Sequence, residues 1–209
     1  MQMEPVGTVR AEDENTFTRA AFSQLVLFVF LNGLVAAAAL VQTRRLGIGR
    51  RALSAPIGAG TVVTGVAGSR VTLGLLQSVL LLAAGTFMFG AVWGDPSATA
   101  VLVLVWAGVA AGAGMLLGAW ARTPEQAVAI AVPTSIALAM LRGTFWPLEA
   151  VGPVMQVVGH LTPHAWAMDA WSAIVNEGAG VAGITTELAV LASVAAVLLA
   201  LAPAHCCAP

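Results

Sequence analysis

Residues 98–120 read ATAVLVLVWAGVAAGAGMLLGAW, and this stretch decides the fold because it contains no charged side chain. A bilayer core is about 30 Å thick, so a helix needs roughly 20 mostly apolar residues to cross it. Lipid offers no hydrogen-bond partner for bare backbone N–H and C=O groups, so a single spanning segment must be a helix. The stretch therefore predicts a transmembrane helix.

Four further apolar runs flank this stretch and give the chain its class. They cover Phe17–Val41, Val71–Trp93, Ala127–Leu141 and Leu188–Pro203. Of the 209 residues, 59% are hydrophobic and 9% are charged, whereas a soluble domain carries about 25% charged residues. The sequence predicts an all-α integral membrane protein with about five transmembrane helices. The predicted spans lie near 17–43, 70–93, 98–120, 126–142 and 184–203.

Charge and composition exclude several classes of function. The net charge is −1, so no basic field favours nucleic acid as a partner. All nine basic residues are arginines, and the Walker loop that binds nucleotide phosphates requires a lysine. We therefore expect the chain to hydrolyse no nucleotide by that route and to bind no cofactor itself. No carboxylate lies at mid-depth in a predicted span, which argues against a transporter driven by protons or sodium ions.

The arginines near the span ends predict the orientation, because Lys and Arg in short loops stay cytoplasmic. One side collects Arg44, Arg45, Arg50, Arg51, Arg122 and, at the foot of the second span, Arg70. The other side has fewer arginines among many acidic residues. The first side is therefore predicted to be cytoplasmic and segment 1–16 extracytoplasmic. An outer N-terminus usually needs a preceding span, so we expect either a larger six-span plan or a companion chain that supplies the rest.

Two segments between the spans are predicted to form regular structure themselves. In Arg44–Pro56, paired arginines alternate with apolar residues, which favours a short helix on the membrane surface. That helix could be a simple positive-inside anchor or a docking element for a cytoplasmic partner. After Arg142 the apolar character resumes, but Gly143 and Pro147 break the helix. We expect an external re-entrant hairpin there, with Glu149 as the nearest carboxylate for Arg142.

Local patterns predict further detail in the third and fourth spans. Residues 122–126 read RTPEQ, a tight turn in which Thr123 and Gln126 form a capping-box pattern. Pro133 predicts a kink in the fourth span. Two small-xxx-small pairs in the third span should give one smooth face for close packing. These pairs are formed by Gly108, Gly112, Gly114 and Gly118.

Two histidines offer an alternative of a different class. His160 and His164 are four residues apart and, with Asp169, could form a metal site or the centre of a membrane enzyme. Pro163 lies between them, and metal sites need three or more ligands. We therefore keep this interpretation as the weaker one.

Several short motifs are each weak signals alone, but their order and spacing together are specific. They are Arg50–Ile57 (RRALSAPI), Gly65, Gln77, Phe89–Gly90, Thr123–Ala127 (TPEQA), Gly143–Glu149 (GTFWPLE) and Leu161–Ala170 (LTPHAWAMDA). In this order they resemble the type-2 ABC-transporter permease family, especially the bacterial daunorubicin-resistance-type drug exporters. The resemblance covers nearly the whole chain from Phe17 onward, so that residues 17–209 look like one permease domain.

The resemblance implies a function and a set of partners. The chain would be the multi-pass permease subunit of an exporter in the bacterial cell membrane, not itself an enzyme. It would work as a dimer with a second permease copy or a companion permease. A separate ATP-binding subunit would hydrolyse ATP, and the cargo would be a hydrophobic or amphiphilic, drug-like compound. Such drug efflux would confer antibiotic resistance.

The resemblance also implies the site residues. The coupling loop that docks on the ATP-binding subunit would contain Arg44, Arg45, Arg50, Arg51 and Pro56. The outer gate in the re-entrant hairpin would contain Arg142, Gly143, Phe145, Pro147 and Glu149. The family's first span has no counterpart in this sequence. This departure leaves an alternative open, in which a non-transporting permease fragment acts as a membrane assembly or immunity factor.

Overall fold

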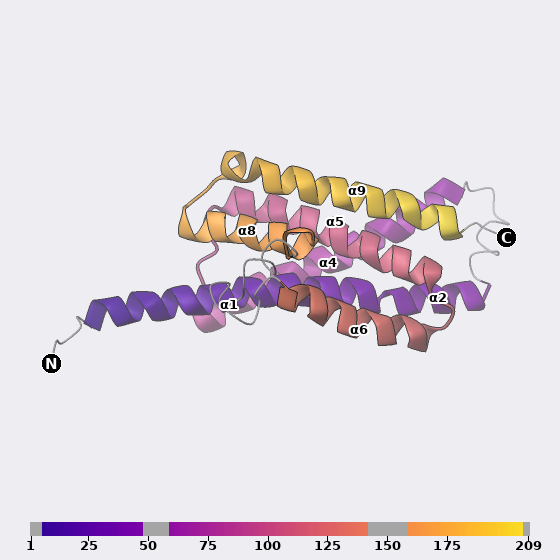
Figure 1. Cartoon of the computed structure of the whole chain (residues 1–209), viewed down its shortest axis with the longest axis horizontal. Helices are drawn as coiled ribbons and strands as arrows, with labels where there is room; N and C mark the ends of the chain where they lie inside the picture. Colours follow the sequence, from indigo (N-terminus) through magenta and orange to yellow (C-terminus); the bar gives the residue numbers. More distant parts are fainter. Residues whose placement is uncertain (1–5, 48–58, 142–158, 207–209) are drawn as a thin grey trace.

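The computed structural model of the chain describes residues 6–47, 59–141 and 159–206. Every regular element in these ranges is a helix, and the helices lie side by side in an elongated bundle (Figure 1). The elements are α1 (Val6–Val35), α2 (Ala37–Arg45), α4 (Ala59–Phe89), α5 (Pro96–Trp120), α6 (Pro124–Leu141), α8 (Pro163–Asn176), the short 3-10 helix η2 (Val181–Ile184) and α9 (Thr185–Cys206).

Five stretches in these ranges are long and apolar enough to cross a membrane. They are Phe17–Arg45, Gly60–Phe89, Pro96–Trp120, Pro124–Leu141 and Val181–Ala202. The predicted all-α membrane fold with five spans is therefore confirmed. The predicted re-entrant hairpin falls on residues 142–158, which lie outside the described part of the chain.

Helix α4 starts earlier than the second span predicted from the sequence, which began near residue 70. It begins at Ala59, because the weakly polar residues before Arg70 continue the helix. Their hydroxyl groups bond within it, as Thr64 does by donating to Gly60 O at 2.9 Å. With a rise of about 1.5 Å per residue, Arg70 lies about 16 Å along the axis from Ala59. Arg70 is thus inside the helix and not at its foot.

Helix α5 lies at the centre of the bundle and touches α1, α2, α4, α8 and α9 (Figure 1). Its start is fixed by Asp95, whose side chain accepts a hydrogen bond from Ala98 N at 2.8 Å. This is a standard N-cap, followed by Pro96 at the first helical position. Helix α8 packs on the same half of the bundle as this start, between α9 and α1 (Figure 1).

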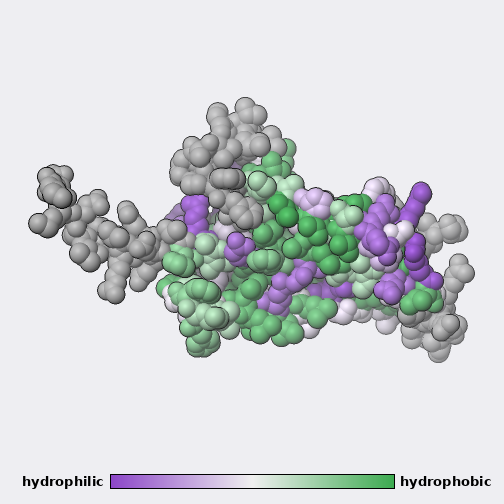
Figure 2. All heavy atoms as spheres, turned by 90° about the horizontal axis from the view of Figure 1, so that it is seen from below, coloured by the Kyte–Doolittle hydropathy of each residue, from purple (hydrophilic) through white to green (hydrophobic). Residues whose placement is uncertain are grey.

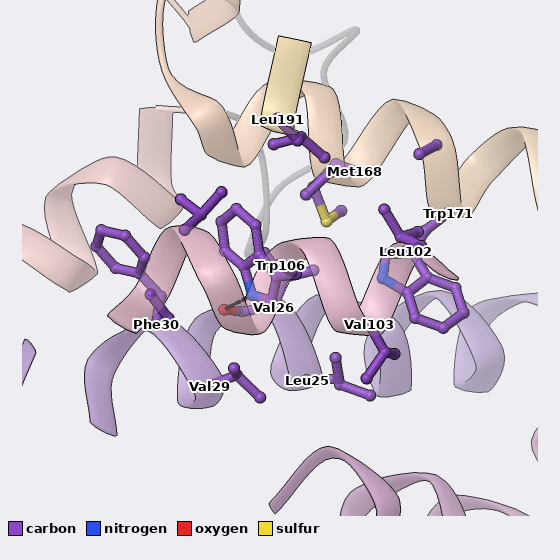
Figure 3. Close-up of a cluster of buried hydrophobic side chains, with 14 of the residues drawn as sticks. Leu25, Val26, Val29, Phe30, Leu102, Val103, Trp106, Met168, Trp171 and Leu191 are labelled. Carbon is purple, nitrogen blue, oxygen red and sulfur yellow. Dashed lines mark hydrogen bonds between the residues drawn. The ribbon is translucent and has the colours of Figure 1, made fainter. Parts of the chain in front are cut away.

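The core forms where the C-terminal half of α1 packs against α5 (Figure 3). Trp106 is 1% exposed there, and its Nε1 donates a hydrogen bond to Val26 O at 3.1 Å. An indole N–H needs such a partner when it is buried. Phe30 stacks on the Trp106 ring with centroids 5.7 Å apart. The pairing fixes the register of α1 against α5.

Small residues on α5 let its neighbours approach closely, but on two faces and not on the single face predicted. A Cβ on Gly114 would collide with Gly33 O of α1, and one on Gly118 would lie 2.8 Å from Leu40 Cδ2 of α2. A Cβ on Gly112 would instead lie 2.8 Å from Leu198 Cβ of α9. The prediction of one face was wrong because two residues turn a helix by about 200°. Gly112 and Gly114 therefore point in nearly opposite directions.

Candidate functional site

The described ranges contain only part of the predicted sites. Arg44 and Arg45 of the predicted coupling loop are described, whereas Arg50, Arg51 and Pro56 lie outside the described residues. All five predicted gate residues also lie outside them. These five are Arg142, Gly143, Phe145, Pro147 and Glu149. The candidate site that the structure shows is therefore the basic end of the bundle, where α2, α5 and α6 meet.

Arg44 reaches from the end of α2 to the end of α5. Its Nη1 donates hydrogen bonds to Gly118 O at 2.8 Å and to Ala119 O at 3.0 Å. The last carbonyls of a helix have no partner within the helix, and a cation there also interacts favourably with the helix dipole. Gly118 lets α2 lie close to α5, because a Cβ there would be 2.8 Å from Leu40 Cδ2. Arg44 of α2 therefore donates hydrogen bonds to carbonyl groups of α5 that have no partner within that helix.

Arg45 makes a parallel contact one residue further on. Its Nε donates to Arg122 O at 3.1 Å, in the turn that joins α5 to α6. We call Arg44 and Arg45, together with the three carbonyls that they bind, the arginine clamp. Guanidinium groups have five N–H donors in a rigid fork, so the clamp uses only some of them. Both side chains remain exposed at the end of the bundle.

The turn after α5 is fixed by its own hydrogen bonds. Gln126 N donates to Thr123 Oγ1 at 3.1 Å, and Arg122 N donates to Gln126 Oε1 at 2.9 Å. The first bond is the predicted cap of α6 by Thr123. The second resembles the other half of a capping box, but Gln126 accepts from Arg122 N, one residue before the N-cap. The pattern is therefore capping-box-like, and it fixes the turn on which the arginine clamp rests.

Polar groups gather at this end of the molecule, and most of the face between the ends is apolar. Figure 2 shows a largely hydrophobic face, with a few hydrophilic patches, that ends in a hydrophilic cap where α2 ends and α6 begins. Arg44, Arg45, Arg122 and Glu125 are all exposed in this cap. Such a division is typical of a bundle whose middle faces acyl chains and whose end faces water and head groups.

The two histidines of the alternative interpretation lie in different surroundings. His160 is at the surface, where its Nε2 lies 3.1 Å from Asp169 Oδ2. His164 is 0% exposed and packs edge-on against Phe30 and Trp106, with ring centroids 4.6 Å and 5.1 Å away. In the described part of the chain, neither ring nitrogen of His164 has a hydrogen-bond partner, and no three potential metal ligands lie together.

Burial lowers the pKa of His164 to about 3, because the charged imidazolium would lose its hydration there. The ring is therefore neutral at physiological pH. Its burial was not predictable from the sequence, since neither the motif LTPHAWAMDA, which contains His164, nor His160 just before it shows which histidine is buried. The sequence also missed Arg70, which it treated as an anchor at the end of a span. The signal that could have shown a longer helix is that residues 59–69 contain no proline and no charged residue.

An apolar helix bundle that ends in a basic, hydrogen-bonded cap is typical of a multi-pass membrane protein. Residues 6–176 match the family described as ABC-2 type transporter, and the chain belongs to this family. The linearmycin resistance permease protein LnrN of Bacillus subtilis (strain 168) is 34% identical over 191 residues, which are 91% of this chain and 49% of that protein. The chain thus spans about half the length of the curated relative that it matches. The predicted resemblance is confirmed.

Proposed function

We propose that the chain is a membrane-spanning permease subunit of an ATP-driven exporter. A separate ATP-binding subunit supplies the energy, since no lysine is present to build a Walker loop. The cargo is a hydrophobic or amphiphilic, drug-like compound, and the resistance named for the Bacillus subtilis relative supports this class. A second permease copy or a companion permease completes the translocation path.

The arginine clamp is the observation that carries this proposal. Residues 46–58 join α2 to α4, and the clamp fixes the α2 end of this connection to α5. Because α5 touches every other described element, a displacement of the connection would move the centre of the bundle. Rigid elements that move together are the usual means by which a docking event reaches a distant site. The predicted coupling role of Arg44 and Arg45 is therefore to position the docking loop.

The first test is co-purification of the ATP-binding subunit with clamp variants. Hydrogen bonds to charged groups contribute about 1.5–3 kcal/mol each. We expect the double variant Arg44→Ala, Arg45→Ala to recover the ATP-binding subunit at least about tenfold less well than the wild type. Drug export from cells should fall in parallel.

The matched control is Arg122→Ala, which removes a charge at the same end but leaves the Arg122 carbonyl in the clamp. It should recover the ATP-binding subunit nearly as well as the wild type. A clamp variant that assembles and exports normally would contradict the proposed role. A wild-type chain that never recruits an ATP-binding subunit would favour the assembly or immunity factor instead.

A further inference from the structure

A groove of about 370 Å³ runs along the bundle between α1, α4 and α5. Its floor is formed by small residues, among them Gly33, Gly74 and Ala107. A Cβ on Gly74 would lie 3.2 Å from Ala107 Cβ, so the floor has no room for larger side chains. One wall is formed by leucines of α4, of which Leu73 is 57% exposed and Leu80 is 62% exposed.

Three polar side chains line this groove, and none of them is acidic. They are Asn32, Gln77 and Arg70. Gln77 is held in place, because its Nε2 donates to Phe28 O at 3.1 Å. Arg70 is partly buried, and it forms no ion pair or hydrogen bond with any residue that the structure describes. Among the residues that the structure describes, no acidic side chain therefore balances the positive charge in this groove.

An unpaired charge inside a membrane span is costly and points to a functional partner. The guanidinium fork of arginine matches the oxygens of a phosphate in a bidentate arrangement. The partner of Arg70 must therefore be an anion, and a phosphate has the best geometry.

The surroundings of Arg70 indicate that this anion belongs to a lipid. Helix α4 is the least covered span, with 11% of its apolar window buried, compared with 56% for α5. A soluble anion would have to cross acyl chains to reach a groove that opens beside such a helix. A phospholipid needs no such crossing, because its chain already fills the space next to the exposed leucines.

The depth of Arg70 also suits a lipid head group. Ala36 lines the same groove and lies nine residues before Arg45, which is about 14 Å along a helix. Arg45 belongs to the hydrophilic cap, so Arg70 lies in the leaflet next to that cap. A long arginine side chain can extend toward the head groups while its stem stays among apolar atoms.

We propose that this groove binds an anionic phospholipid of the leaflet next to the arginine clamp. The lipid phosphate pairs with Arg70, and one acyl chain lies along α4 over Gly33 and Gly74. This site is independent of the proposed export, since it concerns the outer, lipid-facing side of α4. It would add to the packing of α4 on α1 and α5 along the edge where the α4 leucines are exposed.

The test is native mass spectrometry of the detergent-purified chain with dioleoyl phosphatidylglycerol. Dioleoyl phosphatidylcholine is the matched lipid, because it has the same acyl chains and no net charge. We expect the wild type to prefer phosphatidylglycerol, and Arg70→Gln to bind it at least about tenfold less. Arg122→Gln, which removes an exposed arginine outside the groove, should bind like the wild type.

Three results would overturn the proposal. The wild type could bind both lipids equally, Arg70→Gln could bind like the wild type, or Arg122→Gln could lose as much binding as Arg70→Gln. Glycerol 3-phosphate serves as a soluble head group, and displacement of the lipid by it at millimolar concentration would show a soluble-anion site instead. If Arg70→Gln does not fold, Arg70→Lys keeps the charge and should keep the preference for phosphatidylglycerol. Loss of that preference in folded Arg70→Lys would contradict the proposal.

Discussion

His164 occupies a position between Phe30 and Trp106 that no charged imidazole could hold. A free histidine has a pKa near 6.5, whereas burial lowers the pKa of His164 to about 3. Between these two values the unfolded chain binds a proton at this residue and the folded chain does not. Stability from this group is therefore complete above about pH 6.5 and decreases as the pH falls toward 3.

This difference in pKa predicts the acid sensitivity of the fold. From pH 7 to pH 5, His164 alone should reduce the free energy of unfolding by about 2 kcal/mol. In the variant His164→Leu, the free energy of unfolding should fall by about 2 kcal/mol less than in the wild type over the same pH range, because leucine binds no proton. Denaturant unfolding in detergent at both pH values measures the effect. Equal losses in the wild type and His164→Leu would contradict the prediction.

At the scale of the element, α5 shows how two packing faces arise from four glycines. Gly114 and Gly118 face α1 and α2, and Gly112 faces α9. In lipid there is no hydrophobic force between helices, so close backbone contact provides much of the attraction. The central place of α5 follows from having such contact on both sides.

Substitution of single glycines in α5 should show how much each close contact contributes to the stability of the fold. Gly114→Ala should destabilise the folded protein by about 1–3 kcal/mol, because its Cβ would collide with Gly33 O and force the helices apart. Gly108→Ala is the matched control, since its Cβ would lie 3.6 Å from Ala195 Cβ in ordinary contact. Thermal unfolding in detergent should show a lower midpoint for the first variant only. Two equal midpoints would mean that the close approach is not needed.

The elements also show what the sequence could predict and where it failed. Apolar length depends on local composition, so the five spans were predictable, as was the capping-box-like pattern of Thr123 and Gln126. The faces of α5 were mispredicted although the rotation per residue was known, because the four glycines were treated as one pattern. The depth of Arg70 depends on where α4 starts, and the burial of His164 depends on which helices meet. Both are properties of the tertiary arrangement, and no local pattern contains them.

For the whole molecule, the arrangement of the helices makes the predicted orientation testable. Helices α5 and α9 both end near the hydrophilic cap, and α5 begins at the opposite end (Figure 1). The orientation predicted from the arginines places the cap in the cytoplasm. The cysteines Cys206 and Cys207, at the end of the chain, should then be cytoplasmic too.

A membrane-impermeant maleimide checks this orientation in cells. The wild type should be labelled only after the cells are permeabilised. A variant with both cysteines changed to serine and with Ser97→Cys should be labelled in intact cells, because Ser97 is exposed at the opposite end of α5. The reverse pattern would show that the clamp faces outward, and it would rule out docking of a cytoplasmic subunit there.

The two glycine faces of α5 restrict how this protein can diversify. Most larger side chains on either glycine face would push a neighbouring helix away. Few residues on these faces can therefore be replaced without loss of the fold. Only positions such as Leu104, which is 51% exposed, are free to vary on that helix. Replacements should therefore be tolerated better at the exposed positions of α4 and α6, such as Leu80 and Ile136, than at the glycines of α5.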